Sequence, residues 1–142
     1  MSATIRDAIY YELSNAAAIT ALVSTRIYPA GDVPQAPTLP YLAWFKVDNQ
    51  HTRHQSGGSD LAQARFQIDA WATTATAAEA IYEALRGVLD NYSGDMGDPG
   101  DSVTVRSCVL DTDSSGFIPP TAGGPRGLQR QTMDFLIWYR ED

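Results

Sequence analysis

The sequence predicts one α+β domain, in which an antiparallel sheet of about four strands carries two to three helices on one face. Three segments repeat apolar residues at helical spacing, and four segments alternate apolar and polar residues with period two. The chain has 142 residues, the length of one ordinary domain, and contains neither an internal repeat nor an interdomain linker. We therefore expect a single domain that covers residues 1–142, with long loops between its strands.

Two helices are expected near the N-terminus. Residues 4–14 place an apolar residue at every fourth position, and Thr4 and Asp7 are suited to cap the start of this helix. A shorter helix follows, with Asn15 as its cap. The residues expected to face inward are Ile5, Ile9 and Leu13 on the first helix and Ile19, Leu22 and Val23 on the second.

The longest helix is expected at about residues 77–91. Thr76 and Glu79 have the spacing of a capping box, in which each side chain binds the backbone N–H of the other residue. Ser93 and Gly94 are suited to end the helix. Its apolar stripe consists of Ile81, Leu85, Val88, Leu89 and Tyr92.

Four strands are expected at residues 41–48 and 64–72, around residues 103–109, and around residues 133–139. Each has one apolar face, which we expect to lie against the helices. These faces consist of Tyr41, Ala43, Phe45 and Val47; of Phe66, Ile68 and Ala70; of Val103, Val105 and Val109; and of Met133, Phe135, Ile137 and Tyr139.

The second face of the sheet is polar but carries Trp44, Trp71 and Trp138. These tryptophans either complete the core at the margins of the sheet or meet a neighbouring subunit.

Three connections are expected to be long loops: residues 49–60, 93–102 and 111–127. Loops of this length in a small domain are usually functional or disordered. In a protein that contacts copies of itself, such loops would serve as the contacting arms.

The composition excludes several classes of protein. Ten basic and 17 acidic residues give a net charge of −7, and the second half of the chain holds eleven of the acids. Proteins that bind nucleic acid through the phosphates usually have a basic balance. The single cysteine, Cys108, allows no disulfide within the chain and makes secretion unexpected. No signal peptide and no apolar run long enough to cross a membrane is found, so we expect a cytoplasmic address.

Metal sites are not expected. His51 and His54 are three residues apart, but their stretch is predicted to be a strand end and a loop, and no cysteine or acidic cluster is close in sequence. Residues 111–116 imitate the first half of a calcium loop, yet Ala122 stands where the loop needs a glutamate. No cofactor motif is present either.

An acid–base site is the main enzymatic alternative, since Asp69 and Asp134 both lie on polar faces of predicted strands. A small hydrolase using these two carboxylates is therefore conceivable. Each carboxylate follows an arginine by four residues, Arg65 and Arg130, so a ladder of ion pairs across the strands is the simpler interpretation. A third class, an adaptor that binds through the prolines of residues 34–40, is kept as an alternative.

The ordered set of segments is similar to a known family. The segments that carry the resemblance are Ile5-Arg6-Asp7-Ala8-Ile9, Leu22-Val23, Arg26-Ile27-Tyr28-Pro29, Pro40-Tyr41, Arg65–Ala72, the helix ending at Tyr92-Ser93-Gly94, and Asp134–Tyr139. In their order and spacing they resemble the tail-completion, or tail-terminator, proteins of long-tailed bacteriophages and prophages.

The resemblance implies a structural virion protein without catalytic residues. Such proteins form rings, commonly hexamers, that cap the finished tail tube, end its growth and join it to the head connector, after assembly in the host cytoplasm. The implied partners are copies of the chain, the tail tube protein and the connector or stopper protein. Another minor neck or stopper protein of the same assembly is the nearest alternative.

The charge split suggests how copies would meet. Closed rings need heterologous contacts, in which one patch meets a different patch. We expect the acidic loops of the second half to face basic residues of the next copy. The interface candidates are Arg53, His54, Arg126 and Arg130 on one side and Asp95, Asp98 and Asp101 on the other. An acidic protein would let DNA pass through the ring without binding it.

Overall fold

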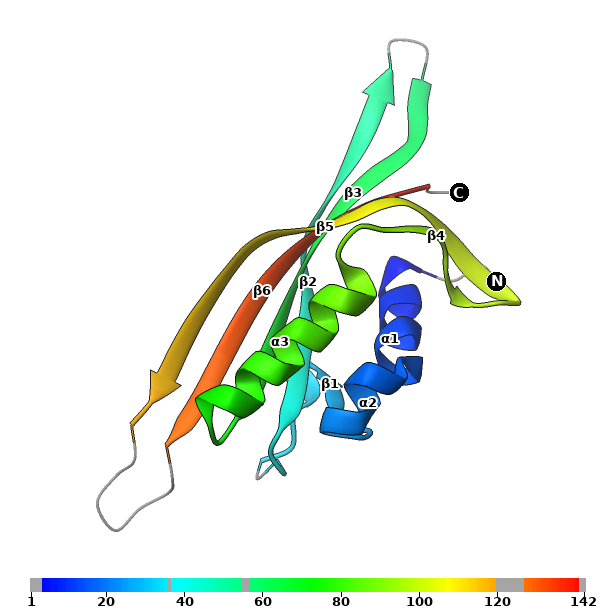
Figure 1. The fold of residues 1–142 in the computed structure, drawn as a ribbon. Helices are drawn as coiled ribbons and strands as arrows, with labels where there is room; N and C mark the ends of the chain where they lie inside the picture. The colour runs from blue at the N-terminus through cyan, green and yellow to red at the C-terminus, as the bar shows by residue number, and fades with distance from the viewer. Residues whose placement is uncertain (1–3, 36, 55–56, 120–126, 141–142) are drawn as a thin grey trace.

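The computed structural model describes residues 4–35, 37–54, 57–119 and 127–140, and for residues 52–54 and 57–60 it describes the backbone alone. A six-stranded sheet in the order β1-β2-β3-β6-β5-β4 carries three α-helices on one face (Figure 1). The helices are α1 (Ile5–Asn15), α2 (Ala17–Val23) and α3 (Ala75–Leu89), with a short 3-10 turn, η1 (Ala30–Asp32). The strands are β1 (Ile27–Pro29), β2 (Tyr41–His54), β3 (Gly57–Ala72), β4 (Tyr92–Asp98), β5 (Asp101–Ile118) and β6 (Leu128–Arg140). The predicted α+β class with helices on one face is confirmed.

The sheet has six strands, not about four. β1 is a three-residue strand parallel to β2, too short to show an alternating pattern. β4 was expected to be a loop because it contains Gly94 and Gly97. Both glycines have positive φ, 119° and 110°. Glycine is the residue that adopts such angles readily, and it is rare in regular strands, so the segment did not show the pattern of a strand. Except for β1, neighbouring strands are antiparallel.

The three expected loops are mostly strand. Residues 49–54 and 57–60 continue β2 and β3 as a hairpin, residues 92–98 and 101–108 pair as β4 and β5, and β5 continues to Ile118. The β2–β3 hairpin extends past the helices at one end of the sheet, and the β5–β6 hairpin extends at the other (Figure 1). Much of each hairpin lies outside the core, so many of its residues are polar or glycine. The segments therefore lack the alternation of apolar and polar residues from which strands are predicted.

Three predicted helix caps are wrong. α3 ends at Leu89 with Asp90 as its C-cap, so Ser93 and Gly94 do not end it and lie in β4. The hydroxyl of Thr74, not Thr76, accepts a hydrogen bond from the N–H of Ala77 at 3.1 Å, so α3 begins two residues earlier than expected. Asn15 does not cap α2, because its side-chain amide donates to the carbonyl of Tyr11 at 2.9 Å in the preceding helix. The capping box at the start of α1, between Thr4 and Asp7, is confirmed.

The inward face of β2 is the opposite of the predicted one. Leu42 and Trp44 are buried beneath the helices, whereas Phe45 and Val47 are 39% and 44% exposed. The register explains this, because Trp44 pairs with Ile68, which lies on the buried face of β3. Apolar residues on both faces of β2 made either choice consistent with alternation alone.

A similar shift occurs in β5. A bulge between Val105 and Ser107 changes the phase of the strand, so Cys108 is buried while Val109 is exposed. The apolar faces predicted for β3 and β6 are confirmed. The largest fully buried side chains of the core are Phe66, Phe135, Ile9, Leu13, Ile19, Leu42, Ile68, Ile81, Leu85, Leu89, Met96 and Met133.

The core lies between the helices and one face of the sheet, and it leaves the other face without a helix (Figure 1). Among the described residues, no helix is long and apolar enough to span a membrane.

Candidate assembly surface

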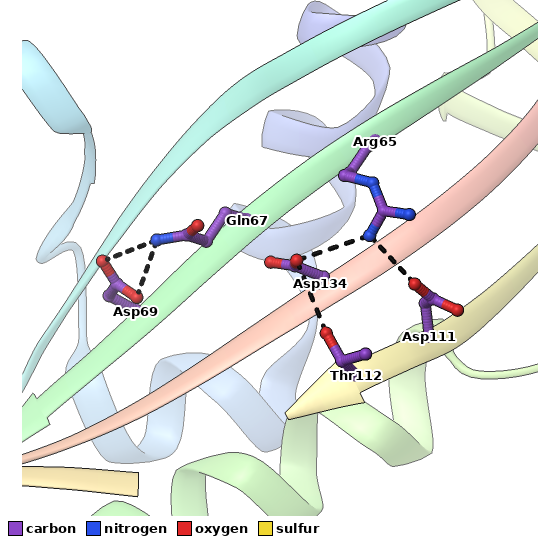
Figure 2. A network of polar contacts seen from close by, with 6 residues as sticks. All are labelled: Arg65, Gln67, Asp69, Asp111, Thr112 and Asp134. Atoms are coloured by element: carbon purple, nitrogen blue, oxygen red, sulfur yellow. Dashed lines mark hydrogen bonds and ion pairs between the residues drawn. The ribbon is translucent and has the colours of Figure 1, made fainter. Parts of the chain in front are cut away.

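A polar network occupies the middle of the face that carries no helix (Figure 2). Arg65 of β3 places Nη1 3.0 Å from Asp111 Oδ2 on β5 and 3.4 Å from Asp134 Oδ2 on β6. The hydroxyl of Thr112 donates to the same oxygen of Asp134 at 3.5 Å. One guanidinium therefore connects three strands, which confirms the predicted ion pairs across the strands for Arg65 and Asp134.

The electrostatics of this network keep Arg65 charged. The hydrogen bond to Asp111 is the main cause that raises its pKa; burial lowers it, and the carboxylates of Asp111, Asp134 and Asp48 add attraction. The second oxygen of Asp134, Oδ1, is buried and has no hydrogen-bond partner in the described part of the chain. The Asp134 carboxylate therefore depends on contacts through its other oxygen.

An aromatic cluster lies at one end of the same face. The rings of Tyr41 and Trp71 stack with centroids 6.4 Å apart, and the Arg130 guanidinium lies 5.6 Å from the Trp71 ring centroid. Gly116, opposite Arg130 on β5, leaves room for this arginine, because a Cβ atom there would lie 3.0 Å from Nη2. Burial, followed by the nearby Asp69 carboxylate, raises the pKa of the Tyr41 phenol and keeps it neutral. Arg130 was expected to take part in the ladder of ion pairs across the strands, and in the structure its guanidinium lies over the Trp71 ring of the neighbouring strand β3.

Of the three tryptophans, two lie on the face without helices. Trp71 and Trp138 are half-buried there. Trp44 is on the helix face instead, where its ring stacks on Tyr10 at 6.1 Å and lies 5.4 Å from the guanidinium carbon of Arg6. The two tryptophans on the open face remain candidates for contact with a neighbouring subunit.

The acidic interface candidates cluster in the β4–β5 hairpin. Asp95, Asp98 and Asp101 are all exposed. Asp95 accepts a hydrogen bond from Thr104 at 3.2 Å, and Asp98 accepts one from the N–H of Gly100 at 3.0 Å. These local contacts fix two carboxylates at one edge of the sheet and leave them accessible to a partner.

The structure does not bring the basic candidates together with these acids within one chain. Arg53 and His54 pair with Gly58 and Gly57 near the end of the β2–β3 hairpin, and their side chains are not described. Arg126 lies outside the described residues. Arg130 lies in the interior of the sheet, on β6.

Asp69 and Asp134, the two carboxylates of the enzymatic alternative, do not contact each other. Asp69 and Asp134 lie on neighbouring strands of the open face, but the amide of Gln67 lies 3.4 and 3.5 Å from the two oxygens of Asp69, and Arg65 binds Asp134 (Figure 2). Each carboxylate thus has a neutralising or hydrogen-bonding partner in the sheet. Among the described residues, no three His, Cys, Asp or Glu side chains are grouped to hold a metal ion.

Two open strand edges were missed by the sequence prediction. β1 covers the outer edge of β2 only at Leu42–Trp44, and β4 covers β5 only as far as Cys108. Among the residues whose side chains the structure describes, six large apolar residues are exposed, and four of them, Phe45, Val47, Phe117 and Ile118, lie beyond these covered parts. The signal in the sequence was the run 114–118, which has no charge and ends in Phe117 and Ile118.

The family profile described as "Tail completion protein gp17" matches residues 7–116. The chain belongs to this family. The match covers most of the elements that build the sheet and all three helices except the start of α1. The predicted family resemblance is therefore confirmed.

A solved structure supports the fold of this tail completion family member. A chain of the "Virion of native gene transfer agent (GTA) particle" superposes with a TM-score of 0.71 and 18% sequence identity. The alignment covers 94% of this chain and 92% of that chain. No curated protein sequence matches. At this identity the likeness establishes a shared fold for the whole domain.

Proposed function

We propose that this chain is a structural subunit of a phage-like tail. Copies of it form a ring, of six subunits, at the head-proximal end of the tail tube. The ring ends tail growth and joins the tube to the connector or stopper protein of the head. The observation that carries the proposal is the tail completion family match over residues 7–116. The fold shared with a chain of a gene transfer agent virion supports it.

The surface of the chain is suited to contacts with copies of itself. A closed ring requires two different patches on each subunit, facing opposite neighbours. The hairpin with Asp95, Asp98 and Asp101 lies at the β4 edge of the sheet, and Arg53 and His54 lie on β2, toward the other edge. We extend the proposal to these residues: the acids of one copy face Arg53, His54, Arg126 and Arg130 of the next copy.

Charge reversal tests this pairing. Arg53→Glu should weaken assembly, and a second change, Asp95→Arg, should restore it in the same chain if the two residues meet between copies. Arg140→Glu makes the same charge change near the C-terminal end of β6 and serves as the control. Unchanged assembly in Arg53→Glu and Arg130→Glu would count against the assignment of these residues.

DNA passes through the proposed ring without being bound. The net charge of −7 opposes the neutralisation of phosphates from which protein–DNA affinity arises. The measurement is a fluorescence anisotropy titration of a labelled duplex with the protein at physiological salt. We expect no saturable binding at micromolar protein, and tight binding would contradict this part of the proposal.

The proposed role includes no catalytic step and no cofactor. Asp69 and Asp134 serve the sheet through their contacts with Gln67 and Arg65. A variant with both residues changed to asparagine should still assemble with tails if it folds, because no reaction depends on the two carboxylates.

The decisive experiment for the role compares tails made with and without the protein. Tail proteins are produced together with this chain, and the tail lengths and tail ends are measured by electron microscopy. We expect tails of uniform length that carry an extra ring at one end, and overlong tubes when the chain is omitted. Uniform tails without this chain would contradict a terminating role, and a ring found only on the head connector would favour a stopper protein.

A further inference from the structure

Each outer edge of the sheet has an open step, a part of β2 or β5 whose outer side none of the described strands covers. The two open steps lie diagonally across the sheet from one another. On the β2 side, β1 stops at Trp44, and no strand in the described part of the chain pairs with the outer edge of residues 45–50. On the β5 side, the backbone N–H groups of Asn91 and Leu110 still bond to Cys108 and Asp90, and no described strand pairs with residues 111–118. Each step therefore exposes unpaired backbone groups, which favour addition of another strand.

We infer that the open edge of β5 in one copy pairs with the open edge of β2 in the next copy, as antiparallel strands, so that the sheets of neighbouring subunits are continuous. The inference rests on the proposed ring of identical subunits and names the contact that holds it together. This contact is heterologous, because the residues 111–118 of one copy meet the residues 45–50 of the other.

Strand direction agrees with this pairing. β2, β3, β6 and β5 alternate in direction across the sheet, so β5 runs opposite to β2. Rotation about an axis that lies roughly along the strands keeps these directions. The β2 strand of the next copy then runs antiparallel to β5 of the first copy, which is the direction that allows closely spaced ladder bonds.

The faces of the two edges also agree. Phe45 lies on the face without helices, as does Ile118, because their partners Gln67 and Leu128 lie on that face. Lys46 and Phe117 lie on the helix face. A register that places Phe45 opposite Ile118 and Lys46 opposite Phe117, with Val47 left unpaired in the bulge between Lys46 and Asp48, therefore keeps both faces continuous across the contact.

The chemistry of the two edges matches in the same register. Phe45 lies opposite Ile118 on the face without helices, and Phe117 lies opposite the side chain of Lys46 on the helix face, with Val47 beside them in the bulge of β2. Phe45, Val47, Phe117 and Ile118 are all exposed in the single chain. Pairing would bury these apolar surfaces, which is the dominant favourable term in association.

At the other end of the contact the β2–β3 hairpin of one copy comes near the acidic part of β5 in the other. When Val47 is left unpaired as the bulge residue of β2, Gln50 lies opposite Ser114, both on the face without helices, and the backbone of Arg53 comes near the level of Asp111. Asp111 and Asp113 are exposed acids in a segment of β5 that has no basic residue. Of the basic candidates, Arg53 is thus the one that this contact brings toward acids of the next copy, and these acids are Asp111 and Asp113 rather than Asp95, Asp98 and Asp101.

The pairing also fixes how far neighbouring copies are displaced from one another along the strands. Phe45 is level with Thr112 across the sheet, through Gln67 and Asp134. Ile118 is six residues farther along β5 than Thr112, so the next copy is displaced by about 20 Å along the strands. Strands that close around an axis require such a displacement, because they tilt relative to it.

Cross-linking between mixed single-cysteine chains tests the contact. Lys46→Cys and Phe117→Cys change exposed positions that the pairing places opposite each other. The two variants are purified separately, mixed with tails, treated with a short bismaleimide and examined by denaturing gel electrophoresis. Cys108 is buried and is present in every chain. The control mixture contains Lys46→Cys and Val109→Cys, since Val109 is exposed but lies where the edge of β5 is covered.

We expect dimers from the Lys46→Cys and Phe117→Cys mixture, at least about tenfold more than from either variant alone or from the control mixture. A chain that carries both cysteines should give a ladder up to the size of the closed ring. If a ring is present by electron microscopy but this mixture gives no more dimer than the control, the edge contact is overturned and the proposed function stands. If neither ring nor dimer forms on tails, both are overturned.

A second variant tests the contact without cysteine. Phe117→Lys removes an apolar residue from the open edge and adds a charge, whereas Val109→Lys makes a similar change on a covered part of β5. We expect Phe117→Lys to weaken association of copies by about tenfold or more, with the unfolding midpoint unchanged. Equal effects of the two changes on association would contradict the inference.

Discussion

Arg65 Nη1 lies 3.0 Å from Asp111 Oδ2, and this contact fastens the central strand β3 to β5 across β6. The same nitrogen lies 3.4 Å from Asp134, whose other carboxylate oxygen is buried without a partner in the described part of the chain. Replacement of Arg65 would therefore leave a partly buried carboxylate without its counter-charge.

We predict that Arg65→Gln lowers the urea midpoint of unfolding more than Asp111→Asn does. The first change deprives two carboxylates of their partner, whereas the second leaves Arg65 bound to Asp134. Urea titrations followed by tryptophan fluorescence measure both. A larger loss for Asp111→Asn would show that Asp134 does not depend on Arg65.

The cap of α3 provides a second prediction. Thr74→Ala removes the hydroxyl that accepts the N–H of Ala77 and should lower the free energy of unfolding by about 1 kcal/mol. Thr76→Ala, two residues later on the exposed first turn, should change it by less than about 0.5 kcal/mol. Thermal or urea unfolding compares the two. If Thr76→Ala cost more, the helix would begin at the box predicted from sequence.

The β4 strand gives a third prediction, which concerns two glycines with positive φ. Gly97→Ala places a Cβ atom 3.2 Å from Cα of Ala8 in α1, whereas Gly94→Ala meets nothing within 4 Å. Both changes carry the strain of a left-handed residue, about 1–2 kcal/mol. Only the first also pushes β4 from α1, so we expect its loss in unfolding free energy to be the larger by at least about 1 kcal/mol. Equal losses would contradict the close approach of β4 to α1.

The buried thiol gives a prediction about pH. Burial, with a smaller contribution from the Asp90 carboxylate, raises the pKa of Cys108 from 9.0 to about 12. Below pH 9 the thiol is neutral in both states, so its contribution to stability is fully present. Between pH 9 and 12 the unfolded chain loses the proton and the folded chain keeps it, so stability falls by about 1.4 kcal/mol per pH unit.

The control for this pH dependence is Cys108→Ala. Burial is also the first cause that raises the pKa values of Tyr41, Tyr82 and Tyr92, so some decline above pH 10 remains in the variant. The decline in unfolding free energy should be less steep in Cys108→Ala than in the parent chain. Identical slopes would mean that the thiol is accessible to solvent in the folded state.

The parts of the fold that the sequence predicted share a simple physical cause. β3 and β6 are central strands with an unbroken alternation, and Phe66, Ile68, Phe135 and Ile137 are buried as expected. The helices were predicted because their inward faces are apolar. In these elements one face is buried along the whole length, so the periodicity determines the result.

The prediction failed in strands that do not have a single face buried along their whole length. In β2, Trp44 and Phe45 are both apolar, and only the pairing with β3 decides that Trp44 faces the helices. In β5 a bulge before Ser107 reverses the faces, and alternation gives no sign of it. The terminal parts of β2 and β5 lie outside the core, so they lack the buried face that would have revealed them as strands.

The surface was predicted less well than the fold. The ion pair between Arg65 and Asp134 followed from their positions on polar faces, but Asp111 was assigned to a loop. The stacking of Arg130 on Trp71 requires the register of β3 and β6, which no local pattern gives. The open edges are properties of strand length relative to neighbouring strands and therefore appear only in the assembled sheet.

The most direct test of the central claim, that this chain acts by assembling with copies of itself, is native mass spectrometry of the protein released from purified tails, together with images of the tail ends. We predict a closed ring whose mass is six times that of the 15.4 kDa chain, located at the end of the tube that receives the head. Tails that carry the chain only as a monomer, or that contain none of it, would contradict the account.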